Sequence, residues 1–131
     1  MVFVTPLFAA IFGLMYVFLS FVVIKHRSKH QVSIGSGNNE ELKTEVHIHA
    51  NFSEYVPLCL ILLFLLENLT LSSNLAFWLG SLLLLSRVFH VIGMRGGKPR
   101  YFFRVAGMLG TFAVILISSL AMLWLYLPIS I

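Results

Sequence analysis

Four long apolar stretches limit what this chain can fold into. They cover about residues 3–24, 46–66, 75–94 and 101–127. Each approaches the roughly 20 residues that a helix needs to cross the hydrocarbon core of a bilayer. The sequence therefore predicts an all-α protein, an integral membrane bundle of four helices.

The composition supports a single membrane domain over residues 1–131. Hydrophobic residues make up 59% of the sequence and charged residues 11%, whereas a soluble domain carries roughly a quarter charged residues. No long polar run is present that could form a second domain. The net charge of +4 comes from basic residues at the ends of apolar stretches, where they set topology. We therefore discount nucleic-acid binding, and we expect the first stretch to be a retained helix rather than a signal peptide.

The positions of lysine and arginine predict an orientation. These residues occur in the connections 25–45 and 95–100, but not in the connection 67–74 and not near either terminus. Because basic loops stay on the cytoplasmic side, both basic connections should be cytoplasmic and both termini should lie outside. Three aromatic residues would then lie near the outer interface, as in an aromatic belt: Trp78, Trp124 and Tyr126.

Local patterns predict where the helices begin and how they pack. Asn38, followed three residues later by Glu41, resembles a capping box, so the second helix should begin before the bilayer. Residues 96–99, which read Gly-Gly-Lys-Pro, should break the chain before the fourth helix. The fourth stretch has small residues at helical spacing, which would let another helix approach closely: Gly107, Gly110 and Ala113.

Polar side chains interrupt the second apolar stretch on one side. On a helix that turns about 100° per residue, His47, Asn51 and Glu54 fall within about 60° of one another, whereas His49 points to the other side. An ionisable group in hydrocarbon costs at least a few kcal/mol and often marks a functional site. This face of the second helix is therefore the first candidate for a site.

The third stretch carries a similar polar face, made of Arg87, His90 and Met94. Measured from the cytoplasmic side at about 1.5 Å per residue, Glu54 lies roughly 12 Å deep and Arg87 roughly 10 Å deep. A buried Arg or Glu is costly alone and much less costly in a hydrogen-bonded pair. We therefore expect Glu54 and Arg87 to approach each other, either within one chain or between chains.

Other interpretations of these residues are a structural ion pair and a metal site. The charged pair could lock the helices together without any chemistry. A metal site is disfavoured, because His47 and His49 have the wrong spacing for two ligands on one helix face and the chain has no HExxH motif. His26 and His30 have a suitable spacing, but at a basic connection we interpret them as interfacial.

Three segments together resemble one family of membrane proteins. They are HANFSEYVP over residues 49–57, RVFHVIG over residues 87–93 and FRVAGMLGT over residues 103–111. They resemble the second, third and fourth helices of the membrane-associated proteins in eicosanoid and glutathione metabolism (MAPEG), in particular the short bacterial-type members. This family includes microsomal glutathione transferases and prostaglandin E synthase. The resemblance covers essentially the whole chain.

The resemblance implies a homotrimer in which glutathione, as co-substrate, binds between neighbouring chains and is open to the cytoplasmic side. A lipophilic electrophile would enter from the bilayer, and no metal is implied. Arg104 matches the arginine that faces the glutathione thiol, so it is the expected catalytic residue. The expected glutathione-binding residues come from the first three helices: Arg27, His47, His49, Asn51, Glu54, Tyr55, Arg87 and His90.

The chain departs from the family pattern at two places. Many relatives have arginine where this chain has His47, which implies an anion contact that is weaker or depends on pH. Several mammalian members have tyrosine where this chain has His90 and Met94. This chain therefore has no phenolic hydroxyl at those positions, and no role for one is carried over from the mammalian members.

Thiol chemistry explains why an arginine is expected beside glutathione. A free thiol has a pKa near 8.5, so only a minor fraction is thiolate at neutral pH, and the thiolate is the nucleophile. A guanidinium stays protonated and pairs well with anions. Without the resemblance, Arg104 would be interpreted as a charge at a helix end that sets topology.

We therefore expect a membrane glutathione transferase that conjugates glutathione to lipophilic electrophiles, with lipid-hydroperoxide peroxidase activity as a further expectation. Its expected location is the cell (inner) membrane. One alternative is a trimeric binder of lipid or glutathione without catalysis. The other is a small transporter that uses Glu54 as a proton or cation site.

Overall fold

The computed structural model describes residues 2–95 and 100–130, and within these residues it contains four long helices. They are α1 (Thr5–His30), α2 (Glu40–Thr70), α3 (Ser73–Met94) and α4 (Tyr101–Ser130). Each contains a segment that is long and apolar enough to cross a membrane. The prediction of an all-α, four-helix membrane fold is therefore confirmed.

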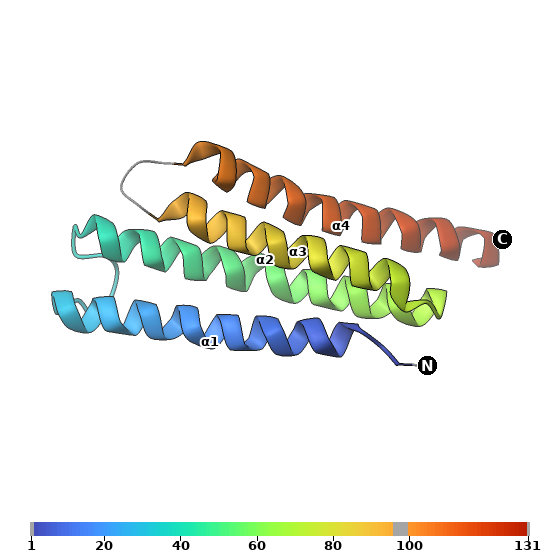
Figure 1. Cartoon of the computed structure of the whole chain (residues 1–131), viewed down its shortest axis with the longest axis horizontal. Helices are drawn as coiled ribbons and strands as arrows, with labels where there is room; N and C mark the ends of the chain where they lie inside the picture. The colour runs from blue at the N-terminus through green and yellow to red at the C-terminus, as the bar shows by residue number, and fades with distance from the viewer. Residues whose placement is uncertain (1, 96–99, 131) are drawn as a thin grey trace.

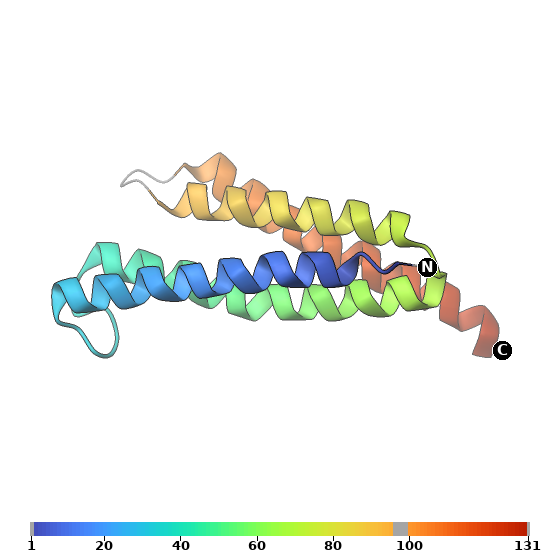
Figure 2. The ribbon, with the colours of Figure 1, turned by 60° about the horizontal axis from the view of Figure 1, so that its bottom comes forward.

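The four helices run side by side along the long axis of the molecule (Figure 1), and a second view shows the same arrangement (Figure 2). Both termini lie at one end. The α1–α2 connection lies at the other end, together with the end of α3 and the beginning of α4. Each helix contributes a buried side chain to the common core: Phe12, Leu63, Leu83 and Val114.

The α1–α2 connection sets where α2 begins. Asn39 is the N-cap, and its side-chain oxygen accepts a 2.8 Å hydrogen bond from the backbone nitrogen of Leu42. Asn38 lies in the preceding turn with a φ of 60°, a left-handed conformation that asparagine tolerates better than most residues. The predicted capping box of Asn38 and Glu41 is therefore wrong by one residue. An N-cap needs an extended backbone, and the turn provides it only at Asn39, with φ −95° and ψ 115°.

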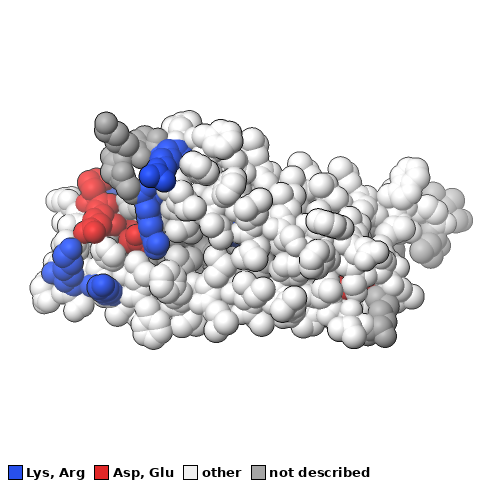
Figure 3. Space-filling model, in the orientation of Figure 1, with Lys and Arg blue, Asp and Glu red and all other residues white. Residues whose placement is uncertain are grey.

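Charged side chains gather at the end that carries this connection. Figure 3 shows lysine, arginine and glutamate side chains there, while the rest of the same face is almost entirely uncharged. Within the charged end, the Glu41 carboxylate lies 3.3–3.7 Å from side-chain nitrogens of His26, Lys29 and His30. Apolar helices with charged residues gathered at one end are typical of proteins that span a membrane, because the charges stay at the water interface.

Glycines bring α3 and α4 into close contact. A Cβ atom at Gly107 would lie 2.6 Å from both the backbone nitrogen of His90 and the backbone oxygen of Ser86. A Cβ atom at Gly110 would collide with the hydroxyl of Ser86. The predicted close approach of another helix is confirmed at these two glycines. The chain break predicted at residues 96–99 lies outside the described residues.

A buried carboxylate closes the opposite end of the bundle. The sequence predicts Glu67 in the connection after the second span, whereas it lies in the last turn of α2 and is fully buried. It accepts hydrogen bonds from the backbone nitrogen of Val4 at 2.7 Å and from the backbone nitrogen and hydroxyl of Thr5 at 3.0 and 2.6 Å. The first N–H groups of a helix have no acceptor within it and carry partial positive charge. Glu67 therefore caps α1 from another helix.

Replacing Glu67 with alanine is expected to lower the thermal unfolding midpoint of the protein in detergent. Three donors at the start of α1 would lose their acceptor, and each buried donor left unsatisfied costs about 1–3 kcal/mol. Glu40→Ala is the control, because that side chain is 86% exposed at the other end of α2. Equal midpoints for the two variants would show that Glu67 does not hold α1.

Candidate functional site

A polar cavity of about 330 Å³ lies between α2, α3 and the first turn of α4. His47, Asn51 and Glu54 line it from α2, His90 lines it from α3, and Arg104 lines it from α4. Pockets for small molecules measure roughly 300–1,000 Å³, so the cavity has room for a small ligand. A polar lining within apolar helices makes this cavity the candidate functional site.

The local structure explains why these five side chains meet. The three residues of α2 share a face because offsets of four and seven residues return to the same side of a helix. Arg104 joins them because α4 begins close to the end of α3. A Cβ atom at Gly93 would collide with the backbone nitrogen of Arg104, so a glycine is needed at this contact.

Arg87 lies behind the cavity wall, and its side chain is fully buried. Its Nη2 donates a 2.6 Å hydrogen bond to Oδ1 of Asn51, and its Cζ lies 5.8 Å from the centre of the Phe52 ring. Its Nε and Nη1 have no hydrogen-bond partner among the described residues. Because the side-chain oxygen of Asn51 accepts the hydrogen bond from Arg87, the NH₂ group of Asn51 remains available as a donor. Arg87 therefore fixes the orientation of Asn51 in the cavity wall.

The predicted pair of Glu54 and Arg87 does not form within the chain. Glu54 is exposed and lines the cavity, and no ion pair joins it to a described residue, whereas Arg87 bonds to Asn51. The comparison of depths placed the two residues at the same level, but depth does not fix how α3 is rotated about its axis. In the structure this rotation turns Arg87 into the core beside Phe52. A pair between neighbouring chains stays a prediction.

Three of the predicted site residues contact other parts of the protein. Arg27 donates a 2.8 Å hydrogen bond from Nη1 to the backbone oxygen of a glycine in the α1–α2 connection. His49 lies against α1, with its Nε2 2.9 Å from the hydroxyl of Ser20. Tyr55 packs edge to face on the ring of Phe112 in α4. None of the three lines the cavity, and their contacts with glutathione stay predictions.

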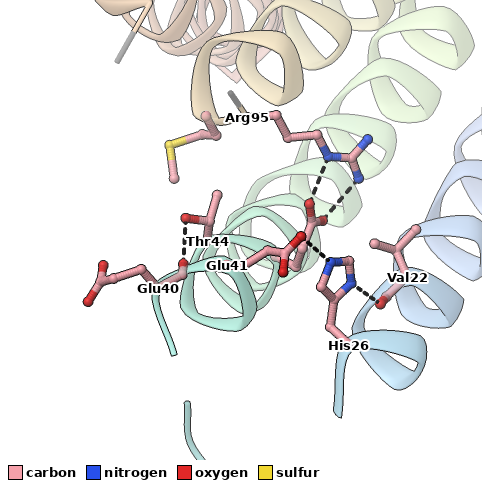
Figure 4. A pocket seen from close by; sticks show the side chains of 8 residues that line it. Val22, His26, Glu40, Glu41, Thr44 and Arg95 are labelled. Carbon is pink, nitrogen blue, oxygen red and sulfur yellow. Dashed lines mark hydrogen bonds and ion pairs between the residues drawn. The ribbon is translucent and has the colours of Figure 1, made fainter. Parts of the chain in front are cut away.

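An ion pair beside the cavity was not predicted from the sequence. Arg95, at the end of α3, donates from Nε and Nη2 to the two carboxylate oxygens of Glu45 on α2 at 2.9 and 3.0 Å. The pair lines a second cavity of about 620 Å³, in which Figure 4 shows Arg95 opposite His26 and Glu41. The sequence contains a signal for this pair, because Glu45 directly precedes the second predicted span and Arg95 directly follows the third. Both residues are therefore expected at the same edge of the bilayer.

Four helices of membrane-spanning length, with a polar cavity near the charged end, define a small integral membrane protein. The sequence model of the MAPEG family matches residues 5–124. The chain is also 31% identical over 125 residues to "Inner membrane protein YecN" of Escherichia coli strain K12, an alignment that covers 95% of this chain and 93% of the relative. The protein of the same name from Escherichia coli O6:H1 gives the same values. The chain therefore belongs to the MAPEG family, as its three segments predict.

Proposed function

We propose that this protein is a membrane glutathione transferase that binds glutathione in the cavity between α2, α3 and α4. The observation that carries the proposal is that one cavity presents an oriented amide donor on Asn51, a carboxylate on Glu54 and a guanidinium on Arg104. Glutathione offers the complementary groups, namely carboxylates and peptide carbonyls, an ammonium group and a thiol. The choice of glutathione rather than another peptide rests on the resemblance to the MAPEG family.

Each of these residues would have a separate role. The amide of Asn51 would donate to an oxygen of glutathione, and the carboxylate of Glu54 would bind its ammonium group. Arg104 would stabilise the thiolate once the S–H bond breaks and the proton leaves to solvent. The sulfur lone pair then forms a bond to an electrophilic carbon of the lipophilic substrate. A leaving group departs with its electron pair, or the resulting carbanion takes up a proton.

The polar residues on the outside of the single chain support a homotrimer. His47, Glu54 and Arg104 are exposed in the chain alone, although they belong to helices of membrane-spanning length. A charged side chain that faces hydrocarbon is costly. We therefore propose that neighbouring chains cover this face and complete the site, with Arg27 of one chain as the expected contact for a glutathione carboxylate.

The proposed location is the inner membrane, in keeping with the name of the relatives from Escherichia coli. In this orientation the end with the α1–α2 connection is cytoplasmic, because it carries most of the basic residues. The cavity for glutathione then opens near the cytoplasmic side, where the water-soluble thiol would enter.

A titration of the purified protein in detergent tests the proposal. Glutathione is expected to give saturable ultraviolet absorbance of a thiolate at neutral pH, because the guanidinium favours the anion. S-Methylglutathione, which has no thiol, is the control, and it should bind without this signal. If glutathione binds without forming a thiolate, the protein is a non-catalytic binder rather than a transferase. Binding of neither compound would exclude both functions.

A further inference from the structure

The ion pair of Glu45 and Arg95 is a non-covalent cross-link between α2 and the end of α3. Its two hydrogen bonds are 2.9 and 3.0 Å long, and the two side chains are 9% and 36% exposed. A bidentate pair of this kind fixes the direction of both groups as well as their separation. By contrast, Lys43 and Glu40 form a 4.0 Å pair at the same end of α2, with both side chains more than half exposed.

The cross-link is directly connected to the walls of the candidate site. Met94, the residue before Arg95, lines both the 330 Å³ cavity and the 620 Å³ cavity. Gly93, one residue earlier, packs against the backbone nitrogen of Arg104. The position of the last turn of α3 therefore determines where α4 begins, and with it where Arg104 lies in the cavity.

The charges of the pair also matter for the site. Both carboxylate oxygens of Glu45 accept hydrogen bonds from Arg95, so the charge of this guanidinium is already balanced by a carboxylate. Among the described residues that line the 330 Å³ cavity, Arg104 is the one with a permanent positive charge. A misplaced Arg104 would have no replacement within the described part of the chain that forms this cavity.

We propose that Glu45 and Arg95 form a positioning pair, which holds Arg104 at the place where it can stabilise the glutathione thiolate. The inference rests on the proposed function, since it concerns the same site. Neither residue of the pair lines the 330 Å³ cavity in which glutathione is proposed to bind. It sets the distance between α2, which binds the peptide of glutathione, and Arg104, which faces the sulfur. Loosening the pair should therefore leave glutathione bound to α2 and reduce the thiolate that Arg104 stabilises.

The first test separates binding from thiolate formation. In Glu45→Gln and Arg95→Lys, the thiolate fraction at saturating glutathione is expected to fall about 10-fold, since small displacements of a catalytic group have effects of up to about 100-fold. The affinity for S-methylglutathione should stay nearly unchanged. Exchanging the two residues, as Glu45→Arg with Arg95→Glu, should restore much of the thiolate. Glu40→Gln, which breaks the exposed pair with Lys43, should leave both quantities as in the wild type.

A parallel loss of affinity and thiolate in Glu45→Gln, without recovery in the exchanged variant, would assign the pair a general structural role and overturn the inference. A thiolate signal that does not change in either single variant would also overturn it.

The second test does not depend on glutathione. Hydrogen–deuterium exchange should show amides of residues 91–95 and 101–108 exchanging faster in Glu45→Gln than in Glu40→Gln, because the end of α3 and the start of α4 are released together. Unchanged exchange would overturn the inference even if the thiolate changed. If the wild type forms no thiolate, the proposed function fails and with it the role for the thiol. The exchange measurement then still decides whether the pair holds the start of α4.

Discussion

Replacing Arg104 with alanine is expected to abolish the thiolate of bound glutathione and leave the fold intact. The guanidinium lines the cavity, and its side chain is exposed rather than packed in the core. Removing one group that stabilises an anion in an active site costs roughly 100- to 1,000-fold in turnover. The bound thiol should then return to an ordinary pKa near 8.5, so that little thiolate remains at neutral pH.

Arg100→Ala is the matched control for this variant. Arg100 is also exposed and lies directly before the same helix, and its backbone oxygen accepts the hydrogen bond of the Arg104 backbone nitrogen. It does not line the 330 Å³ cavity. The measurement is the thiolate absorbance and the rate of conjugation with a lipophilic electrophile. Equal activity of the two alanine variants would show that Arg104 acts only as a charge at a helix end.

Introducing valine at Gly107 is expected to separate α3 from α4 and to destabilise the protein severely. The added Cβ atom would lie 2.6 Å from two backbone atoms of α3, those of Ser86 and His90. Backbone atoms within a helix cannot move aside as a flexible side chain can. Overpacking costs about 1–3 kcal/mol of folding free energy and occasionally more. We expect a cost at the upper end of this range for Gly107→Val, because both helices must shift. Thermal unfolding in detergent and the elution profile of the purified protein measure the effect.

Gly13→Val provides the comparison for this second prediction. A Cβ atom at Gly13 of α1 has no described atom within 4 Å, so the same substitution meets open space in the single chain. We expect its unfolding midpoint to stay near that of the wild type. If Gly107→Val unfolds at the same temperature as Gly13→Val, the close packing of α3 and α4 contributes little to stability.

Periodicity within single helices was sufficient to predict part of the site. The shared face of His47, Asn51 and Glu54 depends only on the geometry of one helix, and the structure places all three on the same cavity. The separate direction of His49 follows from the same rule, and its contact with Ser20 of α1 agrees with it.

Contacts between helices could not be predicted in the same way. The sequence places Glu54 and Arg87 at the same depth, but Asn51 is the residue that bonds to Arg87. Which of the two residues of α2 meets Arg87 depends on how both helices are rotated, and a shift of a few tens of degrees decides between them. The N-cap at Asn39 instead of Asn38 is a similar case, because the backbone of the preceding turn selects between two asparagines that are chemically identical.

The cap on α1 also has a consequence for how the protein can be made. The carboxylate that completes the start of α1 is supplied by Glu67, which is 63 residues after Val4 in the chain. Because synthesis runs from the N-terminus, α1 is made before its acceptor exists, and it gains that acceptor only when the whole of α2 has been made and packs antiparallel to α1. The hydrogen bonds at the start of α1 are thus completed only when the first two helices form a hairpin. A chain that stops before residue 67 carries a first helix whose leading N–H groups lack the partner that holds them in the complete protein.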